Sequence, residues 1–212
     1  MQLGRGRRSA IGTFGFFHGG FLADRGVDIG NPVSPLEVRT EFPKWPIALI
    51  QFDGWKGSHG LVELAAFDKI ATSKQEERDR MARMLCEGIV PAVYAHDYKV
   101  FSESVYEFGC QSGRYYRDVQ GGDYYNPSVA QTVDALRSAG IRGVIQSSWG
   151  PTLAVFLNDP GQLDVVRRIA SSIASKAIVQ LTEACNRGFE IMDSQTTTCR
   201  FIADIEEKSC QN

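Results

Sequence analysis

Residues 144–157 constrain the fold of this chain more than any other part of the sequence. An apolar pair before the turn and the apolar run Leu153–Leu157 after it predict two neighbouring strands of a hairpin. Between them stands Gln146-Ser147-Ser148-Trp149-Gly150-Pro151, which is chemically richer than the Asn-Gly pair that a tight hairpin needs. Its hydroxyls, amide and backbone N–H groups suit phosphate or carboxylate oxygens. The alternative is a turn in which Trp149 only covers the core and the serines close the reversal.

A basic cluster lies near the amino end of the chain. Arg5, Arg7 and Arg8 place three guanidiniums within four residues, followed by the hydroxyl of Ser9. A guanidinium pairs bidentately with phosphate or carboxylate, although charge clusters near termini are usually solvated arms. Residues 11–22, which follow, are rich in aromatics and glycine, and we expect them to be buried in a tightly bent chain. We therefore expect the cluster and the Trp149 turn to converge around one multiply negative small molecule.

Composition excludes some classes of function. The 212 residues are 43% apolar and 23% charged, as in an ordinary soluble globule, and the net charge is −2. The basic cluster is too local to follow a nucleic-acid backbone, so no nucleic-acid partner is expected. We expect no membrane span, since no apolar run reaches about 18–20 residues. The five cysteines are widely spaced and form no metal or disulfide pattern, which favours reduced thiols and a cytoplasmic location.

The rest of the chain gives an ordered series of predicted elements. Buried strands are predicted at residues 46–52, 144–145, 153–157 and 177–181, with one more at 189–191. Helices are predicted before Pro91, from Phe101 to about Gly113, from Asn126-Pro127 to Gly140, and over residues 163–173. With the helices between about residues 59 and 113 set aside, the order is strand, helix, strand, strand, helix, strand. That is the split βαβ, ferredoxin-like arrangement, with a helical insertion.

The fold class expected is therefore α+β, with residues 1–40 as the remnant of a first domain and residues 41–212 as a ferredoxin-like second domain. The first forty residues show no such order, and they resemble part of a sheet whose partners are missing. We expect the front half of the first domain to be absent from this chain.

Two further segments carry polar groups. Asp24 and Asp28 are candidates to hold Mg²⁺ together with pyrophosphate oxygens, and the alternative for each is a turn or cap. Residues Gln120–Tyr125 form a polar loop before a helix start, which either approaches a ligand or turns the chain.

The motifs together resemble a known family. Gly4-Arg5-Gly6-Arg7-Arg8-Ser9-Ala10-Ile11-Gly12, Gly19-Gly20-Phe21-Leu22-Ala23-Asp24, Gln120-Gly121-Gly122 and Gly143–Thr152 resemble the β-ribofuranosylaminobenzene 5′-phosphate synthases of the GHMP kinase superfamily. The resemblance implies a GHMP-type fold and condensation of a 4-substituted benzoate with phosphoribosyl pyrophosphate. Carbon dioxide and pyrophosphate would be released, in biosynthesis of methanopterin-type carriers of one-carbon units. It also implies a Mg²⁺ requirement and a homodimer.

Residue-level differences bear on the mechanism. Kinases of this superfamily commonly carry Ser-Gly-x-Asp, with a glycine pair seven residues beyond the aspartate. Here Ser9 is followed by Gly12, and Gly19-Gly20 lies seven residues further on, so the spacing is kept without the carboxylate. A kinase of that mechanism needs a group that orients or deprotonates its acceptor. The alternatives are an ATP-dependent small-molecule kinase and an inactive ligand-binding remnant. Arg5, Arg7, Arg8, Ser9 and Gln146–Gly150 are the predicted substrate-binding residues, and Asp24 is the predicted metal ligand.

Overall fold

The computed structural model describes residues 10–24, 26, 34–52, 75–148, 150, 152–193 and 196–200, with the backbone alone for Val119 and residues 191–200. The chain divides into two compact units, one of residues 1–42 with 184–212 and the other of residues 43–183. This division differs from the predicted ranges 1–40 and 41–212 in grouping the last residues with the first unit. The reason is local hydrogen bonding: Gly20 N–H donates to Cys185 O (2.7 Å) and Phe189 N–H to Phe16 O (2.8 Å).

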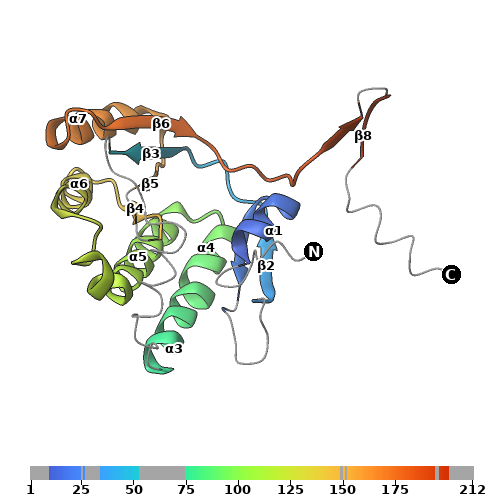
Figure 1. Cartoon of the computed structure of the whole chain (residues 1–212), viewed down its shortest axis with the longest axis horizontal. Helices are drawn as coiled ribbons and strands as arrows, with labels where there is room; N and C mark the ends of the chain where they lie inside the picture. The colour runs from blue at the N-terminus through green and yellow to red at the C-terminus, as the bar shows by residue number, and fades with distance from the viewer. Residues whose placement is uncertain are drawn as a thin grey trace. The chain divides into compact units, whose positions relative to one another are not determined.

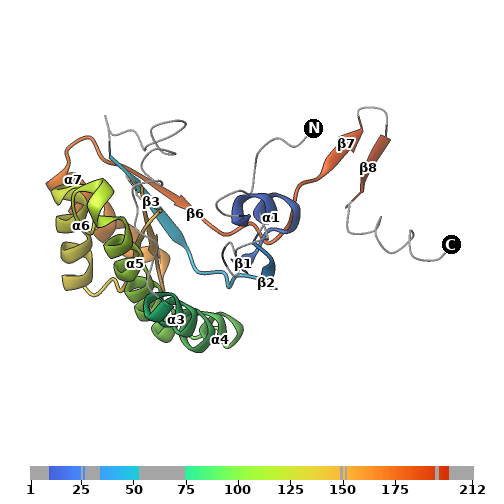
Figure 2. The same ribbon diagram turned by 60° about the horizontal axis from the view of Figure 1, so that its bottom comes forward.

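The second unit is built on a four-stranded sheet (Figures 1 and 2). Its strands are β3 (Ile47–Gln51), β4 (Gly143–Gln146), β5 (Leu153–Phe156) and β6 (Ile178–Thr182). They lie in the order β4-β5-β3-β6, and every neighbouring pair is antiparallel. This is the predicted ferredoxin-like order, and the prediction is confirmed.

Helices cover both faces of the sheet at β4 and β5, whereas Ile178 and Leu181 of the edge strand β6 are 59% and 42% exposed. Val144 pairs with Val155, and both belong to the core that α6 (Pro127–Ser138) and α7 (Leu163–Ile173) also supply. Successive side chains of a strand point to opposite faces, so Phe156 points the other way, and its ring meets that of Phe101 of α5 (Tyr98–Gln120) at 5.0 Å. The 3-10 turn Pro160–Gln162 leads into α7.

The predicted helix end at Pro91 is wrong. Helix α3 (Gln75–Arg83) continues through a π-helical segment, Met84–Ile89, into α4 (Val90–Tyr94). A proline ring clashes with the carbonyl four residues earlier in an α-helix. The wider π turn directly before Pro91 relieves this clash, so the chain stays helical. No helix among the described residues is long and apolar enough to cross a membrane.

The predicted end of α5 near Gly113 is also wrong, because α5 runs to Gln120 and stops at Gly121, which has a left-handed φ of 82°. Gly113 serves a close contact instead. A Cβ atom there would overlap the carbonyl oxygen of Asp123 in the α5–α6 connection, residues 121–126. The predicted start of α6 is confirmed, since Asn126 caps it by accepting a hydrogen bond from Val129 N–H (3.0 Å).

The first unit contains helix α1 (Ile11–His18) and two small antiparallel sheets, β1 (Phe21–Asp24) with β2 (Leu36–Thr40) and β7 (Ile191–Asp193) with β8 (Thr196–Arg200). The predicted burial of residues 11–22 is wrong for Phe16 and Phe17, which are 59% and 47% exposed. Both rings pack against Phe189, which leaves their other sides open to solvent. Phe16 stacks on Phe189 with the ring centroids 4.4 Å apart, and Phe17 meets it edge-on at 5.3 Å.

Replacing Gly113 by alanine tests the close contact between α5 and the connection. A glycine in a helix normally gains about 0.5–1 kcal/mol of stability when it becomes alanine. We expect Gly113→Ala to lose about 1–3 kcal/mol instead, because the added methyl group meets the Asp123 carbonyl. The matched control is Gly12→Ala in α1, where no atom lies within 4 Å of the added Cβ. Urea unfolding of both variants gives the comparison, and a gain at Gly113 equal to that at Gly12 would contradict the contact.

Candidate functional site

The β4–β5 turn holds four of the predicted substrate-binding residues together. Gln146, Ser147, Ser148 and Gly150 are described, whereas Trp149 lies outside the described residues. The turn is closed from within, because Ser147 N–H donates to Thr152 O (2.9 Å) and Gly150 N–H donates to Ser147 O (2.8 Å). The side chains of Ser147 and Ser148 are exposed. The backbone donors of Ser147 and Gly150 therefore serve the turn, and the serine hydroxyls are the groups that face solvent.

Gln146 is the buried polar residue of this turn, with 8% of its surface exposed. It follows Val144 on the same face of β4, so its side chain points toward the start of α6. Its Oε1 accepts a hydrogen bond from Tyr125 N–H (2.7 Å), and its Nε2 donates to Gln120 Oε1 (3.3 Å) and Ser148 O (3.2 Å). The carboxamide thus joins the hairpin turn to the α5–α6 connection.

Gly150 allows the hairpin turn to lie this close to the α5–α6 connection. Its φ is 70°, in the left-handed region that favours glycine. A Cβ atom at this position would lie 2.8 Å from Tyr125 Cβ and 3.1 Å from Gln146 Cδ. A larger residue would therefore push the turn away from the connection.

The connection is held against the end of α5 by polar contacts. Arg117 Nε and Nη2 donate to the two carboxylate oxygens of Asp123 at 2.6 and 2.9 Å. Gln120 Nε2 donates to Gly113 O (3.3 Å). The hydrogen bond from Arg117 lowers the pKa of Asp123, and the same bond raises the pKa of Arg117. Asp123 is therefore a carboxylate at neutral pH, and the pair carries no net charge.

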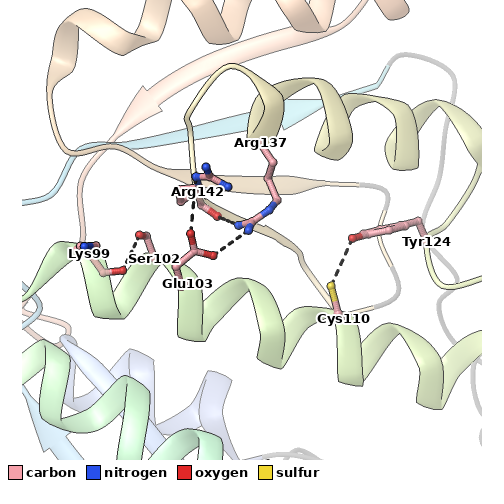
Figure 3. Close-up of polar contacts among 7 residues, drawn as sticks. All are labelled: Lys99, Ser102, Glu103, Cys110, Tyr124, Arg137 and Arg142. Atoms are coloured by element: carbon pink, nitrogen blue, oxygen red, sulfur yellow. Dashed lines mark hydrogen bonds and ion pairs between the residues drawn. The ribbon is translucent and has the colours of Figure 1, made fainter.

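Tyr124 is fixed from the same helix. Figure 3 shows its hydroxyl directed at the thiol of Cys110 in α5, with 3.7 Å between oxygen and sulfur. Burial is the main cause that raises the pKa of Tyr124 above that of an ordinary phenol, and the neighbouring Cys110 raises it further. The phenol stays protonated at neutral pH, so Tyr124 is able to donate a hydrogen bond but is no general base.

A second network secures the far end of α6. Arg137 Nη2 donates to Glu103 Oε2 (2.8 Å) and Arg137 Nη1 to Arg142 O (2.7 Å), while Arg142 Nε lies 3.6 Å from Glu103 Oε1 (Figure 3). The Arg137 guanidinium also lies 3.6 Å from the centre of the Tyr106 ring. Helix α6 and the start of β4 are thereby bound to α5, which keeps the connection in place from both sides.

Beside the end of α5 lies an open cavity of about 510 Å³. Its lining comes from the end of α5, the connection and the first turn of α6: Arg117, Gln120, Gly121, Gly122, Asp123, Tyr124, Tyr125, Asn126, Pro127 and Ala130. The volume is in the range of small-molecule sites. The loop Gln120–Tyr125, for which the sequence left two interpretations open, both turns the chain and lines the cavity.

The structure does not describe all of the predicted site residues. Arg5, Arg7, Arg8, Ser9 and Trp149 lie outside the described residues, so their binding role and their convergence on one ligand stay predictions. Sequence reasoning missed the Arg117–Asp123 pair, because its members face each other only after α5 has ended and the chain has turned. It also missed the structural task of the Gln146 side chain, for which no signal exists in the sequence.

Asp24, the predicted metal ligand, ends β1 in the first unit. Its Oδ1 accepts a hydrogen bond from Gly26 N–H (3.1 Å), which is the turn role given as the alternative. Its Oδ2 is buried and has no hydrogen-bond partner. Magnesium is usually held by one or two carboxylates together with substrate phosphates, so a single orphaned carboxylate oxygen fits it. Within the described ranges no group of three or more His, Cys, Asp and Glu residues is placed to hold a metal ion, and Asp28 lies outside them.

The chain is similar to two curated synthases. The chain is 27% identical over 202 residues to β-ribofuranosylphenol 5′-phosphate synthase of Methanothermobacter thermautotrophicus, which covers 88% of this chain and 59% of that protein. It is 26% identical over 207 residues to the synthase of the same name from Archaeoglobus fulgidus, covering 89% and 62%. The chain thus spans about three fifths of the length of these curated relatives. No protein-family model matches it.

Solved structures show the fold. Homoserine kinase from Cytophaga hutchinsonii is similar with a TM-score of 0.56 at 12% identity, covering 82% of this chain and 51% of that one. Galactokinase from Lactococcus lactis, complexed with galactose, gives 0.56 at 11% identity, covering 83% and 54%. The predicted α+β, GHMP-kinase-like fold is confirmed, as is the resemblance to the ribofuranosyl 5′-phosphate synthases.

Replacing Gln146 by leucine tests the link between the turn and the connection. Leucine keeps the approximate size but leaves the Tyr125 N–H without its acceptor, and we expect a loss of about 1–3 kcal/mol in the free energy of unfolding. The control is Gln131→Leu at an exposed position of α6, expected to change stability by less than about 0.5 kcal/mol. Hydrogen exchange at the Tyr125 amide reports the bond directly, and unchanged protection in Gln146→Leu would show that the link is not needed.

The tyrosines predict a loss of stability in alkali. Burial is the leading cause that raises the pKa of Tyr98, Tyr106 and Tyr124 in the folded chain. The folded state then holds these protons more tightly than the unfolded state. This stabilisation is therefore complete below about pH 10 and is lost as the pH rises through the higher folded values. Free energies of unfolding measured from about pH 7 to 11 should fall less in Tyr124→Phe than in wild type. Tyr94→Phe, at an exposed position, is the control, and an equal effect of both changes would contradict the assignment.

Proposed function

We propose that this chain is part of a synthase that condenses a 4-substituted benzoate with phosphoribosyl pyrophosphate and releases carbon dioxide and pyrophosphate. The observation that carries the proposal is the similarity to two β-ribofuranosylphenol 5′-phosphate synthases over nearly nine tenths of the chain. The cavity beside the Gln146 turn supports it, because its volume suits a small molecule.

The proposed reaction balances without any added proton or oxidant. The ring carbon that bears the carboxylate forms a bond to C1 of the ribose, and the C1–oxygen bond breaks with its electron pair leaving on pyrophosphate. The bond between ring and carboxylate then breaks, its electron pair returns to the ring, and carbon dioxide departs. Such a sequence needs stabilisation of an oxocarbenium-like centre and of the pyrophosphate, but no general base.

The described residues suit this requirement. The hydroxyls of Ser147 and Ser148 face solvent beside the connection and are the proposed donors to phosphate oxygens. Tyr124 remains a neutral phenol, which is consistent with a step that takes up no proton. Arg5, Arg7, Arg8 and Ser9 remain proposed contacts for the phosphate groups, and Trp149 for the ring.

Magnesium is proposed as the cofactor, and Asp24 is the residue that would hold it through the buried Oδ2. When bound, the ion would neutralise charge on the leaving pyrophosphate. The relatives are named for a phenol product, which favours 4-hydroxybenzoate over 4-aminobenzoate as the acceptor. A homodimer and a place in methanopterin-type cofactor synthesis belong to the same proposal.

A small-molecule kinase is the second candidate, because the two similar structures named above are kinases. At 11–12% identity this likeness supports the fold and not the activity. Gly12 speaks against it. This residue is exposed in α1, and no atom lies within 4 Å of where a side chain would begin, so packing does not forbid the carboxylate that kinases carry.

Release of labelled carbon dioxide tests the proposed function. The full-length protein that contains this chain is incubated with carboxyl-labelled 4-hydroxybenzoate, Mg²⁺ and phosphoribosyl pyrophosphate. We expect labelled gas only when phosphoribosyl pyrophosphate is present, with an equal amount of pyrophosphate. Labelled 4-aminobenzoate is tested in parallel. The proposal fails if neither benzoate loses its carboxylate, and ADP formation from ATP with a sugar or alcohol acceptor would favour the kinase. Ligand binding without either reaction would favour the inactive remnant.

A further inference from the structure

The charged side chains that line the cavity beside the Gln146 turn cancel each other. Of the described residues that line it, Arg117 and Asp123 are the charged ones, and two hydrogen bonds of 2.6 and 2.9 Å join them. The bond to Arg117 lowers the pKa of Asp123, so the carboxylate stays ionised and cancels the guanidinium at neutral pH. The Nε and Nη2 donors of Arg117 are both engaged by Asp123.

Neutrality decides which substrate suits this space. Phosphoribosyl pyrophosphate carries a phosphate and a pyrophosphate, and such groups are bound by several cations or by free backbone donors. The described lining offers no unpaired cation. A single flat ring suits it better, because Tyr124 and Tyr125 provide aromatic faces while amide side chains supply hydrogen bonds.

The fold holds this partly exposed pair in a defined place. Gly113 and Arg117 lie four residues apart on one face of α5, and both meet Asp123, the first through its carbonyl and the second through its carboxylate. Gln146 and Cys110 hold the two tyrosines that follow Asp123 in the chain. Asp123 is therefore positioned to keep Arg117 occupied while a ligand enters.

We propose, on the basis of the proposed function, that this cavity binds the 4-substituted benzoate and that its described lining gives the carboxylate no cationic partner. Asp123 acts as a positioning residue that withholds Arg117 from the substrate. A carboxylate paired with a guanidinium is stabilised in the ground state, whereas the charge has moved into the ring when carbon dioxide departs. Because no guanidinium of the described lining stabilises the carboxylate, the bond between ring and carboxylate breaks more readily. The electron pair of that bond returns to the ring.

Releasing Arg117 tests the inference. In Asp123→Asn of the full-length protein the guanidinium becomes free to pair with the substrate, and we expect 4-hydroxybenzoate to bind about tenfold more tightly by calorimetry. Binding of the neutral analogue 4-hydroxybenzamide should not change, and turnover to carbon dioxide should fall by about tenfold. In wild type the two compounds should bind within about threefold of each other, since the carboxylate has no partner.

The matched control is Asp164→Asn in α7, which removes the aspartate of another Arg–Asp pair, with Arg167, at a distance of 3.4 Å. It should leave both binding constants and turnover as in wild type. Asp123→Ser must act in the same direction as Asp123→Asn, which separates charge from any effect of the new amide. Both variants should fold, because the Arg117 and Asp123 side chains are 56% and 37% exposed, and exposed pairs add little stability.

Tighter binding of 4-hydroxybenzoate than of the benzamide by more than about tenfold in wild type would overturn the inference, because the carboxylate would then have a cationic anchor. Unchanged or weaker benzoate binding in Asp123→Asn would overturn it as well. Competition by phosphoribosyl pyrophosphate for the benzoate site would show that the cavity takes the other substrate. If wild type releases carbon dioxide but these results fail, the inference alone falls. If wild type releases none, the proposed function and the inference fall together.

Discussion

The hydrogen bonds of one carboxamide unite the parts of the candidate site. Gln146 ends an edge strand of the sheet, and its Oε1 and Nε2 reach residues 120 and 125, which lie more than twenty positions earlier in the chain. Strand pairing and helix packing bring the β4–β5 turn and the α5–α6 connection near each other, but they do not fix their separation. The buried amide does, because leaving its partners unsatisfied would cost more than a typical hydrogen bond contributes.

Helix α5 provides the platform on which the connection rests. Cys110, Gly113, Arg117 and Gln120 recur at intervals of three and four residues, so they share one face of the helix. Three of them contact the connection: the Cys110 thiol meets Tyr124, Gly113 lies against the Asp123 carbonyl, and the Arg117 guanidinium binds the Asp123 carboxylate. The fourth, Gln120, accepts a hydrogen bond from the Gln146 side chain. A helix that ended at Gly113 would have lost half of this face.

The difference between the predicted and the observed end of α5 shows which features the sequence predicts and which it does not. Strands such as Leu153–Phe156 and the cap at Asn126 follow from local rules of burial and hydrogen bonding, and their order gave the ferredoxin-like topology. Gly113 and Pro91 carry the same local signals as helix ends, but neither ends a helix. Gly113 leaves room for the Asp123 carbonyl of a crossing chain, and a π turn precedes Pro91. The Arg117–Asp123 pair and the side-chain role of Gln146 depend on the completed fold, so no spacing in the sequence announced them.

The proposed chemistry depends on how the charges at the site are arranged. A phosphoryl transfer of the kinase type needs a carboxylate near the acceptor, and Gly12 has none although space is open there. Ribosyl transfer with loss of carboxylate needs no base, and the cavity offers a phenol held in its neutral form and a charge pair that cancels itself. A neutral wall would be a poor host for pyrophosphate, but it lets an aromatic carboxylate keep its full charge on the bond that must break. On this argument the charge balance of the cavity, more than any single nucleophile or base, would select the reaction.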